Sequence, residues 1–285
     1  MHPTSVAFAA RSGTLLVGYT ASDAPDGRLR LLRPDGLIRV DVVDSGPVLN
    51  ASLDADARVA AVVRDTDAGT RVELWRLDRL RPDKPLWRIP VPESEAPTDI
   101  ALSSDGRRLL VTTVFGLARI YDVAKRRLLH TLAAGTAADP GPETFYRGVF
   151  SPDGKTVAVA GSRDVRLWDS ASGRERGYRL SGHTSVLRSV AYSADGRRIV
   201  TASADGTTRV WNAATGELLT VLSRHAGRVN AAAFLPNGWI VSAGEDRTVR
   251  AYPCESCVPA GELQALATRQ VTRELSDREL ADFGG

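Results

Sequence analysis

The chain has very little cysteine and no long apolar run. Its only two cysteines are Cys254 and Cys257, so 285 residues contain no disulfide framework. No segment approaches the roughly 18 consecutive apolar residues that a membrane-spanning helix needs. The first residues also lack the basic and apolar regions of a signal peptide. These absences predict a cytoplasmic protein that does not enter a membrane.

Lysine is also scarce. Three lysines stand against 34 arginines, and the formal net charge is only +3. The arginines are scattered along the chain rather than gathered in blocks, so a strong nucleic-acid-binding patch is not indicated.

One pattern recurs in the segments 150–173, 192–216 and 234–254. Each has an aromatic residue, a polar turn ending in Gly, an alternating apolar stretch, an acidic turn and a second alternating stretch that ends in Trp or Tyr. A repeat of about 40–45 residues built from short strands is typical of β-propeller blades. The closing position recurs every 41 to 47 residues, at Leu31, Trp75, Tyr121, Trp168, Trp211 and Tyr252.

The repeat over 188–222 shows how one blade is built. Short stretches rich in Val, Ile, Thr and Trp are separated by turns, and Gly196 can adopt the positive φ that a tight turn needs. The sequence therefore predicts an all-β fold: a β-propeller of six four-stranded antiparallel blades over residues 1–257, with seven blades as the alternative.

After Tyr252 the strand pattern stops. Apolar residues at helical spacing predict a helix over about 260–274 within a short C-terminal tail, 258–285. This helix could dock on the propeller or bind a partner. Because the tail offers no last strand, ring closure has two solutions. The last blade is three-stranded, or a seven-bladed ring has lost a blade or is completed by another chain.

The repeats resemble those of the WD-repeat family of β-propellers. Trp168-Asp169 is an intact namesake dipeptide, and Gly182-His183 precedes the fifth repeat at the family's spacing. The resemblance implies a hydrogen-bonded His, Ser or Thr, Asp and Trp in each complete blade. The implied positions are His183, Thr201 or Ser203, Asp205 and Trp211 in repeat five; His225, Ser242, Asp246 and, less well matched, Tyr252 in repeat six; and Asp164 and Trp168 in repeat four.

These histidines, hydroxyls and carboxylates are expected to be structural rather than a hydrolase triad, because buried polar groups are stable only when they satisfy one another. Gly154-Lys155-Thr156 lies in a hairpin turn, not a phosphate loop, because an alternating strand follows it. No other catalytic motif occurs, so we expect no enzyme activity and no cofactor. Whether Cys254 and Cys257 bind a metal, form a disulfide or simply pack is left open.

A propeller gathers loops around the mouth of its central channel, and in the WD-repeat family this face usually binds proteins or peptides. The predicted binding residues are Thr98, Tyr146, Arg163, Arg188, Asn230 and Glu245. The chain's ending also resembles the end of WD-repeat regions in large bacterial signalling proteins. The prediction is a non-catalytic scaffold or sensor with a protein or peptide partner. A nucleic-acid-binding propeller and a propeller hydrolase are the alternatives.

Overall fold

A computed structural model describes residues 2–20, 26–67, 69–77, 84–92, 95–133 and 144–254. In this part of the chain every regular element is a β-strand apart from isolated turns, and no helix is long and apolar enough to cross a bilayer. The strands form six separate antiparallel sheets, each built from strands consecutive in sequence. The prediction of an all-β, six-bladed propeller is confirmed. The predicted tail helix lies outside the described residues.

The first three sheets are complete blades of four strands. Blade 1 contains β1 (His2–Ala9), β2 (Thr14–Thr20), β3 (Asp26–Leu32) and β4 (Ile38–Ser45). Blade 2 contains β5 (Val48–Leu53), β6 (Val59–Arg64), β7 (Arg71–Arg76) and β8 (Trp87–Pro90). Blade 3 contains β9 (Pro97–Leu102), β10 (Arg108–Thr113), β11 (Leu117–Asp122) and β12 (Arg127–Ala133).

Two further blades are complete, and the last has three strands. Blade 4 contains β13 (Arg147–Phe150), β14 (Thr156–Ala160), β15 (Asp164–Asp169) and β16 (Glu175–Ser181). Blade 5 contains β17 (Leu187–Tyr192), β18 (Arg198–Ser203), β19 (Thr208–Asn212) and β20 (Leu218–Leu222). Blade 6 contains β21 (Val229–Phe234), β22 (Ile240–Gly244) and β23 (Val249–Tyr252).

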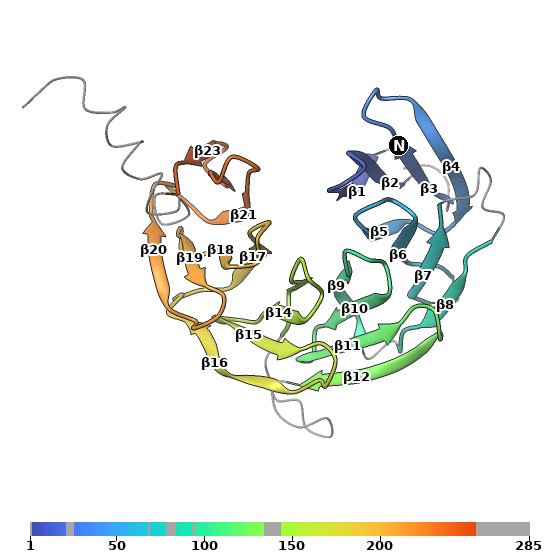
Figure 1. Cartoon of the computed structure of the whole chain (residues 1–285). Helices are drawn as coiled ribbons and strands as arrows, with labels where there is room; N and C mark the ends of the chain where they lie inside the picture. The colour runs from blue at the N-terminus through green and yellow to red at the C-terminus, as the bar shows by residue number, and fades with distance from the viewer. Residues whose placement is uncertain are drawn as a thin grey trace, which may run out of the picture.

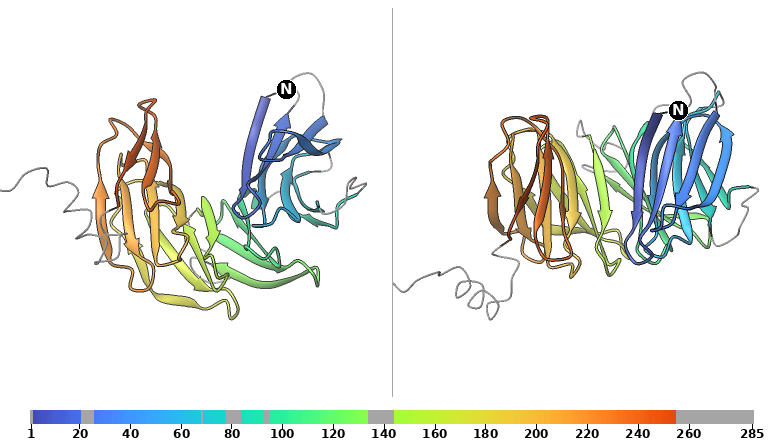
Figure 2. Two further views of the ribbon diagram at one scale, coloured as in Figure 1. Left: turned by 45° about the horizontal axis from the view of Figure 1, so that its top comes forward. Right: turned by 90° about the horizontal axis from the view of Figure 1, so that it is seen from above.

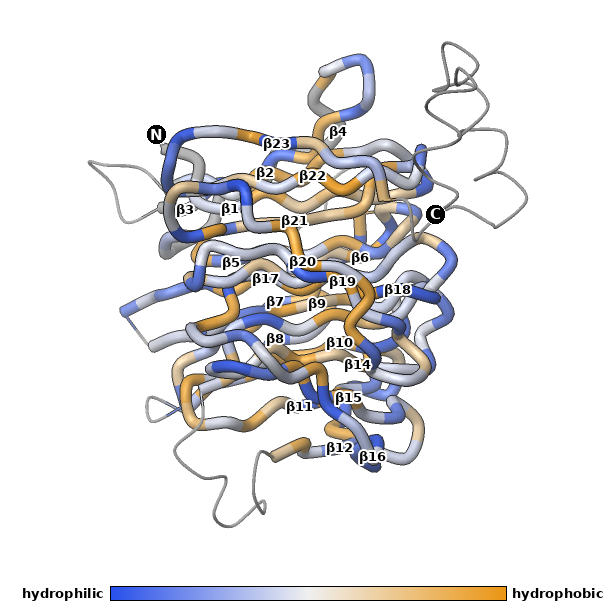
Figure 3. The backbone as a smooth tube through the Cα atoms, turned by 90° about the vertical axis from the view of Figure 1, so that its left-hand side faces the viewer, coloured by the Kyte–Doolittle hydropathy of each residue, from blue (hydrophilic) through white to orange (hydrophobic). Residues whose placement is uncertain are grey.

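The core lies between neighbouring blades. Because successive side chains of a strand point to opposite faces, the middle strands of an inner blade bury both sets. All five residues of β14 are buried, and its four apolar residues divide between the clusters on either side of blade 4. Apolar residues accordingly fill the middles of many strands, while hydrophilic residues gather in the loops at the ends (Figure 3).

A Ser-x-Asp-Gly turn joins the first two strands of blades 3, 4 and 5. In blade 5 the Ser193 hydroxyl donates to Asp195 Oδ1 over 2.6 Å, and the same carboxylate oxygen accepts the Arg197 backbone N–H. Gly196 closes the turn at φ 71°, a left-handed conformation that favours glycine. In these three blades the same local hydrogen bonds fix the turn between the first two strands.

The first strands of the blades line the centre and the fourth strands lie outside (Figure 1). The blades form an arc that stops short of a full circle, leaving an opening between blades 1 and 6 (Figures 1 and 2).

The strand register corrects the closing position of the first sequence repeat. Trp75 lies opposite Ala60 in blade 2, and in blade 1 the equivalent residue opposite Leu15 is Leu32, not Leu31.

Candidate functional site

The antiparallel strands give the ring two ends with different loops. We define the loop face as the end carrying the loops that lead into each first strand and the turns between second and third strands. The turn face is the opposite end, with the turns between first and second strands and between third and fourth strands. His183 and Asp205 belong to the loop face, whereas the Ser-x-Asp-Gly turns lie on the turn face.

In blade 5 a chain of four side chains ties the loop face to the blade core. His183 Nδ1 lies 2.7 Å from Asp205 Oδ2, and His183 Nε2 lies 2.8 Å from Thr201 Oγ1. The Trp211 indole N–H donates to the same hydroxyl oxygen over 2.9 Å. Because a carboxylate only accepts, Nδ1 carries the proton and Nε2 accepts from the Thr201 hydroxyl. With an uncharged imidazole, each hydrogen bond of this four-residue network therefore has one donor and one acceptor.

The pKa shifts of His183 and Asp205 agree with a neutral histidine. Burial lowers the pKa of His183, and the neighbouring Asp205 only partly opposes that effect. For Asp205, burial acts to raise the pKa, but hydrogen bonds from Thr207, from His183 and from the backbone N–H of Thr184 outweigh it and hold the pKa at about 2. A neutral histidine beside an ionised carboxylate is the stable state.

Ser203, the other hydroxyl predicted for this network, makes different hydrogen bonds. Its single hydroxyl proton is shared between the Ser185 and Val186 carbonyl oxygens, and its oxygen accepts the Asp205 backbone N–H, so it holds the loop rather than the histidine. Thr201 is fully buried among its partners. No hydroxyl of this group is presented to a substrate, and the group holds the blade together.

Blade 6 repeats the arrangement with one change. His225 Nδ1 lies 3.0 Å from Asp246, and His225 Nε2 lies 2.8 Å from Ser242 Oγ. Tyr252 occupies the tryptophan position, but its buried hydroxyl has no hydrogen-bond partner among the described residues. The chain of hydrogen bonds thus stops at Ser242, because a phenol cannot place a donor where an indole N–H would lie.

Blade 4 lacks the histidine, and the structure does not bring its two predicted residues into a network. Trp168 is buried and packs edge-on against Phe145, with ring centroids 5.8 Å apart. Asp164 instead lies 3.6 Å from Arg179 Nη1 on the neighbouring strand. Packing therefore replaces the hydrogen-bonded chain in this blade.

Blade 2 contains a buried network that the sequence analysis missed. Glu73 is fully buried and accepts hydrogen bonds from Arg64 Nε, Arg71 Nε, Arg88 Nε and Trp75 Nε1, at 2.8 to 3.2 Å. Arg64 is also fully buried and donates to the Gly46 carbonyl oxygen at the junction with blade 1. An acidic residue two positions before a repeat tryptophan was the available signal.

A second missed cluster lies on the channel wall. Asp99 accepts from Asn50 Nδ2 at 2.8 Å, from Arg147 Nη1 at 3.0 Å and from the Gly148 N–H at 3.0 Å. Burial raises the pKa of Asp99, against the opposing effects of Arg147, Gly148 and Asn50. These three side chains come from equivalent positions of β5, β9 and β13, so comparison of successive repeats could have found them.

The predicted channel-mouth residues divide into two groups. Arg188 and Asn230 are exposed on the first strands of blades 5 and 6, and Arg163 and Glu245 are exposed in turns of the same face. Glu245 lies 3.6 Å from Arg228. Tyr146 and Thr98 form the second group, because both are half-buried.

Thr98 is also half-buried, but its side chain is already engaged. Its hydroxyl donates to the Phe145 carbonyl oxygen of the next blade. Its role in the structure is at the junction of two blades, where the hydroxyl is already used.

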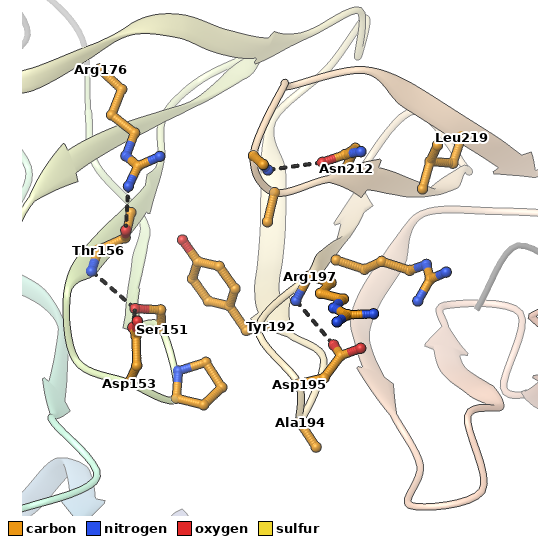
Figure 4. A pocket seen from close by; sticks show the side chains of 15 residues that line it. Ser151, Asp153, Thr156, Arg176, Tyr192, Ala194, Asp195, Arg197, Asn212 and Leu219 are labelled. Atoms are coloured by element: carbon orange, nitrogen blue, oxygen red, sulfur yellow. Dashed lines mark hydrogen bonds between the residues drawn. The ribbon is translucent and has the colours of Figure 1, made fainter. Parts of the chain in front are cut away.

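The turn face carries a cleft of about 850 Å³ between blades 4 and 5 (Figure 4). Its walls include Asp153 and Arg176 from blade 4 and Tyr192, Asp195 and Arg197 from blade 5. Burial raises the pKa of Tyr192, whose hydroxyl points into the space between the two blades (Figure 4). Both signs of charge line this cleft, so it favours no single ligand charge.

No cluster of three or more histidine, cysteine, aspartate or glutamate side chains that could hold a metal occurs among the described residues. Cys254 is buried in the core between blades 5 and 6. Cys254 is disulfide-bonded, and Cys257, the other cysteine of the sequence, lies outside the described residues.

Comparisons with known proteins agree with this architecture. A family model described as "WD domain, G-beta repeat" matches residues 144–169, 174–212 and 216–252, which confirms the resemblance to WD-repeat proteins. The chain is 26% identical to a 66 kDa stress protein of Physarum polycephalum over 88% of its own length and 39% of that protein. It is 30% identical to an uncharacterized WD repeat-containing protein of Synechocystis, over 50% of this chain and 39% of that protein.

Autophagy-related protein 16 of Arabidopsis thaliana is 26% identical over 60% of this chain and 33% of its own length. The chain thus spans less than two fifths of the length of each of these relatives.

Proposed function

Because this chain is a six-bladed propeller with WD40 repeats, we propose that it is a non-catalytic protein-interaction scaffold whose loop face binds a peptide segment of another protein. WD-repeat propellers are generally scaffolds of this kind. The observation that carries the proposal is the contrast in blades 5 and 6. Buried histidine networks fix the loops, and exposed Arg188 and Asn230 stand beside them.

This arrangement suits peptide binding for a physical reason. Loops that are already ordered lose little conformational entropy when a partner binds. Arg163 and Arg188 offer charged donors, and Asn230 offers both a donor and an acceptor to a peptide backbone. Tyr146 adds an aromatic surface of the type that is enriched in binding hot spots. Acidic peptide segments are the ligands that this set favours.

We further propose that the scaffold works in the cytoplasm and regulates a bacterial signalling effector. The resemblance of the chain's ending to WD-repeat regions of bacterial signalling proteins supports this. The match to a Synechocystis WD-repeat protein supports a bacterial setting.

The test replaces Arg188 and Asn230 together with alanine and measures binding to a protein captured with the wild-type chain. Loss of two hot-spot side chains should raise the dissociation constant at least about tenfold, which corresponds to a loss of about 1.4 kcal/mol of binding free energy. The matched control replaces Arg197 and Asn237, which are exposed in turns of the opposite face. Equal affinity of the Arg188/Asn230 variant and the wild type, with the fold intact, would exclude the loop face as the site.

A further inference from the structure

The opening in the ring leaves one face of blade 6 uncovered. Registers place Ala231 beside Ala243, Ala243 beside Val249, and Val241 beside Ala251, so these side chains share a face. We call this face, completed by Ala233 opposite Val241, the blade 6 wall. It carries only alanine and valine at these positions, and Val249 is 73% exposed.

The same positions are covered elsewhere in the ring. In blade 5, Val200, Ala202 and Val210 stand where Val241, Ala243 and Ala251 stand in blade 6. All three are fully buried, because blade 6 packs against them. The blade 6 wall therefore has the composition of an interface between blades without a blade to cover it.

Blade 1 presents a second uncovered face across the opening. Val6 pairs with Val17, and Phe8 pairs with Leu15, which pairs in turn with Leu32. We call this face, together with Tyr19, Arg28 and Arg30, the blade 1 wall. Val6 and Phe8 are 63% and 60% exposed. Both walls border the opening in the ring (Figures 1 and 2).

Blade 2 again shows what these positions look like when covered. Ala51, Leu53, Ala60 and Val62 are the equivalents of Val6, Phe8, Leu15 and Val17 by strand register. Each is at most 8% exposed, because blade 1 packs against it. Contiguous apolar surface of this kind on a soluble protein marks an interaction surface.

We propose that the opening binds one antiparallel β-sheet of a partner protein, with one face of that sheet on each wall. Both walls are pleated sheet faces, and the interfaces within the ring are all formed by one sheet packing on another. This site is distinct from the loop face and goes beyond the proposed scaffold function.

The side chains of the walls define the partner's chemistry. The alanines of the blade 6 wall leave room for bulky apolar side chains such as Leu or Phe. The blade 1 wall supplies Phe8 and Leu15 itself, so small apolar residues fit there.

A second copy of this chain fits the opening poorly. The occupant must offer two uncovered faces on one sheet, whereas blades 2 to 5 are packed on both sides and blades 1 and 6 each have one free face. The C-terminal residues after 254 have apolar side chains at helical rather than alternating spacing.

The test places the photo-crosslinking amino acid p-benzoylphenylalanine at Phe8 or at Ala243 in the full chain, expressed in the cells of its source. We expect both positions to crosslink to the same partner polypeptide, and mass spectrometry to place the two crosslinks within one predicted β-sheet of it. Leu128, which is 46% exposed on the outer strand β12, is the control position and should give no such product. Three results would overturn the proposal: a dimer of this chain, a crosslink to its own residues 255–285, or no product at either wall.

Charged variants supply an independent readout. Val6→Asp with Phe8→Asp, and Val241→Asp with Val249→Asp, should each abolish crosslinking from the opposite wall. Val221→Asp, at a 46% exposed valine of outer strand β20, should leave it unchanged. The Arg188/Asn230 variant should crosslink normally, so failure at the loop face and failure at the opening can be told apart. Undiminished crosslinking in folded wall variants would also contradict the proposal.

Discussion

At the scale of single residues, two different solutions satisfy the tryptophan N–H of a blade. In blade 5, Trp211 donates to Thr201, which the neutral His183 supports. In blade 2, Trp75 donates to the carboxylate of Glu73, whose charge needs arginines around it. A buried indole N–H without a partner costs roughly 1–3 kcal/mol. Blades 2 and 5 thus satisfy the same buried N–H group with different residues.

The histidine solution makes stability depend on pH. The folded pKa of His183 lies below its unfolded value, so the unfolded chain takes up a proton first as the pH falls below about 6.5. The His183 contribution is thus complete above this pH and declines below it, by at most about 1.4 kcal/mol per pH unit. Asp205 adds a second decline, because its stabilising effect is lost as the pH falls from its ordinary value of 3.8 towards about 2.

Urea unfolding of the wild type and of His183→Asn between pH 7.5 and 5 checks this. The variant should be less stable at pH 7.5, and its unfolding free energy should fall less steeply with acidification. His130→Asn, which alters a half-buried histidine of outer strand β12, is the control and should keep the wild-type slope. Parallel slopes for wild type and His183→Asn would show that His183 does not carry the pH dependence.

At the scale of one blade, the Glu73 network replaces the histidine chain with buried charge. Arg64 and Glu73 are both fully buried, and the Arg64 Nε–Glu73 Oε2 distance is 3.1 Å. Removing one member of such a pair strands the other charge in a medium of low dielectric constant. The network also joins two blades, because Arg64 donates to Gly46 between β4 and β5.

Glu73→Gln should therefore destabilise the protein by about 3–5 kcal/mol. Replacing both Arg64 and Glu73 by methionine should cost less than Glu73→Gln alone, because no fully buried charge then remains unpaired; Arg71 and Arg88, the other partners of Glu73, are partly exposed. Glu217→Gln, at an exposed turn of blade 5, serves as the control and should change stability by less than about 0.5 kcal/mol. Chemical unfolding measures all three, and a double variant less stable than the single one would contradict the pairing argument.

At the scale of the whole molecule, the blades stack as a row with two ends. Blades 2 to 5 each pack against two neighbours, whereas blades 1 and 6 each pack against one and face the opening (Figure 1). In repeat proteins the stability of a unit is the sum of its own stability and that of its interfaces with neighbours. The end blades therefore lack one interface contribution each.

Hydrogen exchange of the isolated protein should reveal this gradient. Backbone amides of β22 (Ile240–Gly244) should exchange faster than those of β18 (Arg198–Ser203), although both are second strands with the same pairing. Peptide-level mass spectrometry measures the exchange rates. At the other end of the row, amides of β2 should likewise exchange faster than those of β6. Equal protection throughout would mean that the ring opens as a single cooperative unit.

The sequence alone determined the blade as a unit. Aromatic, turn and alternation signals act within about 40 residues, so they predicted six blades, with seven as the alternative, and a three-stranded final blade as one of two solutions. The partners of His183 and His225 were implied by the resemblance to WD-repeat proteins. What the tertiary structure decided involves residues from different repeats. The Asn50–Asp99–Arg147 cluster, the use of the Thr98 hydroxyl at a junction, and the two uncovered walls depend on how one blade stands beside the next. Local patterning carries no information on that relation, because the packing angle between sheets is set by the side chains of both faces together.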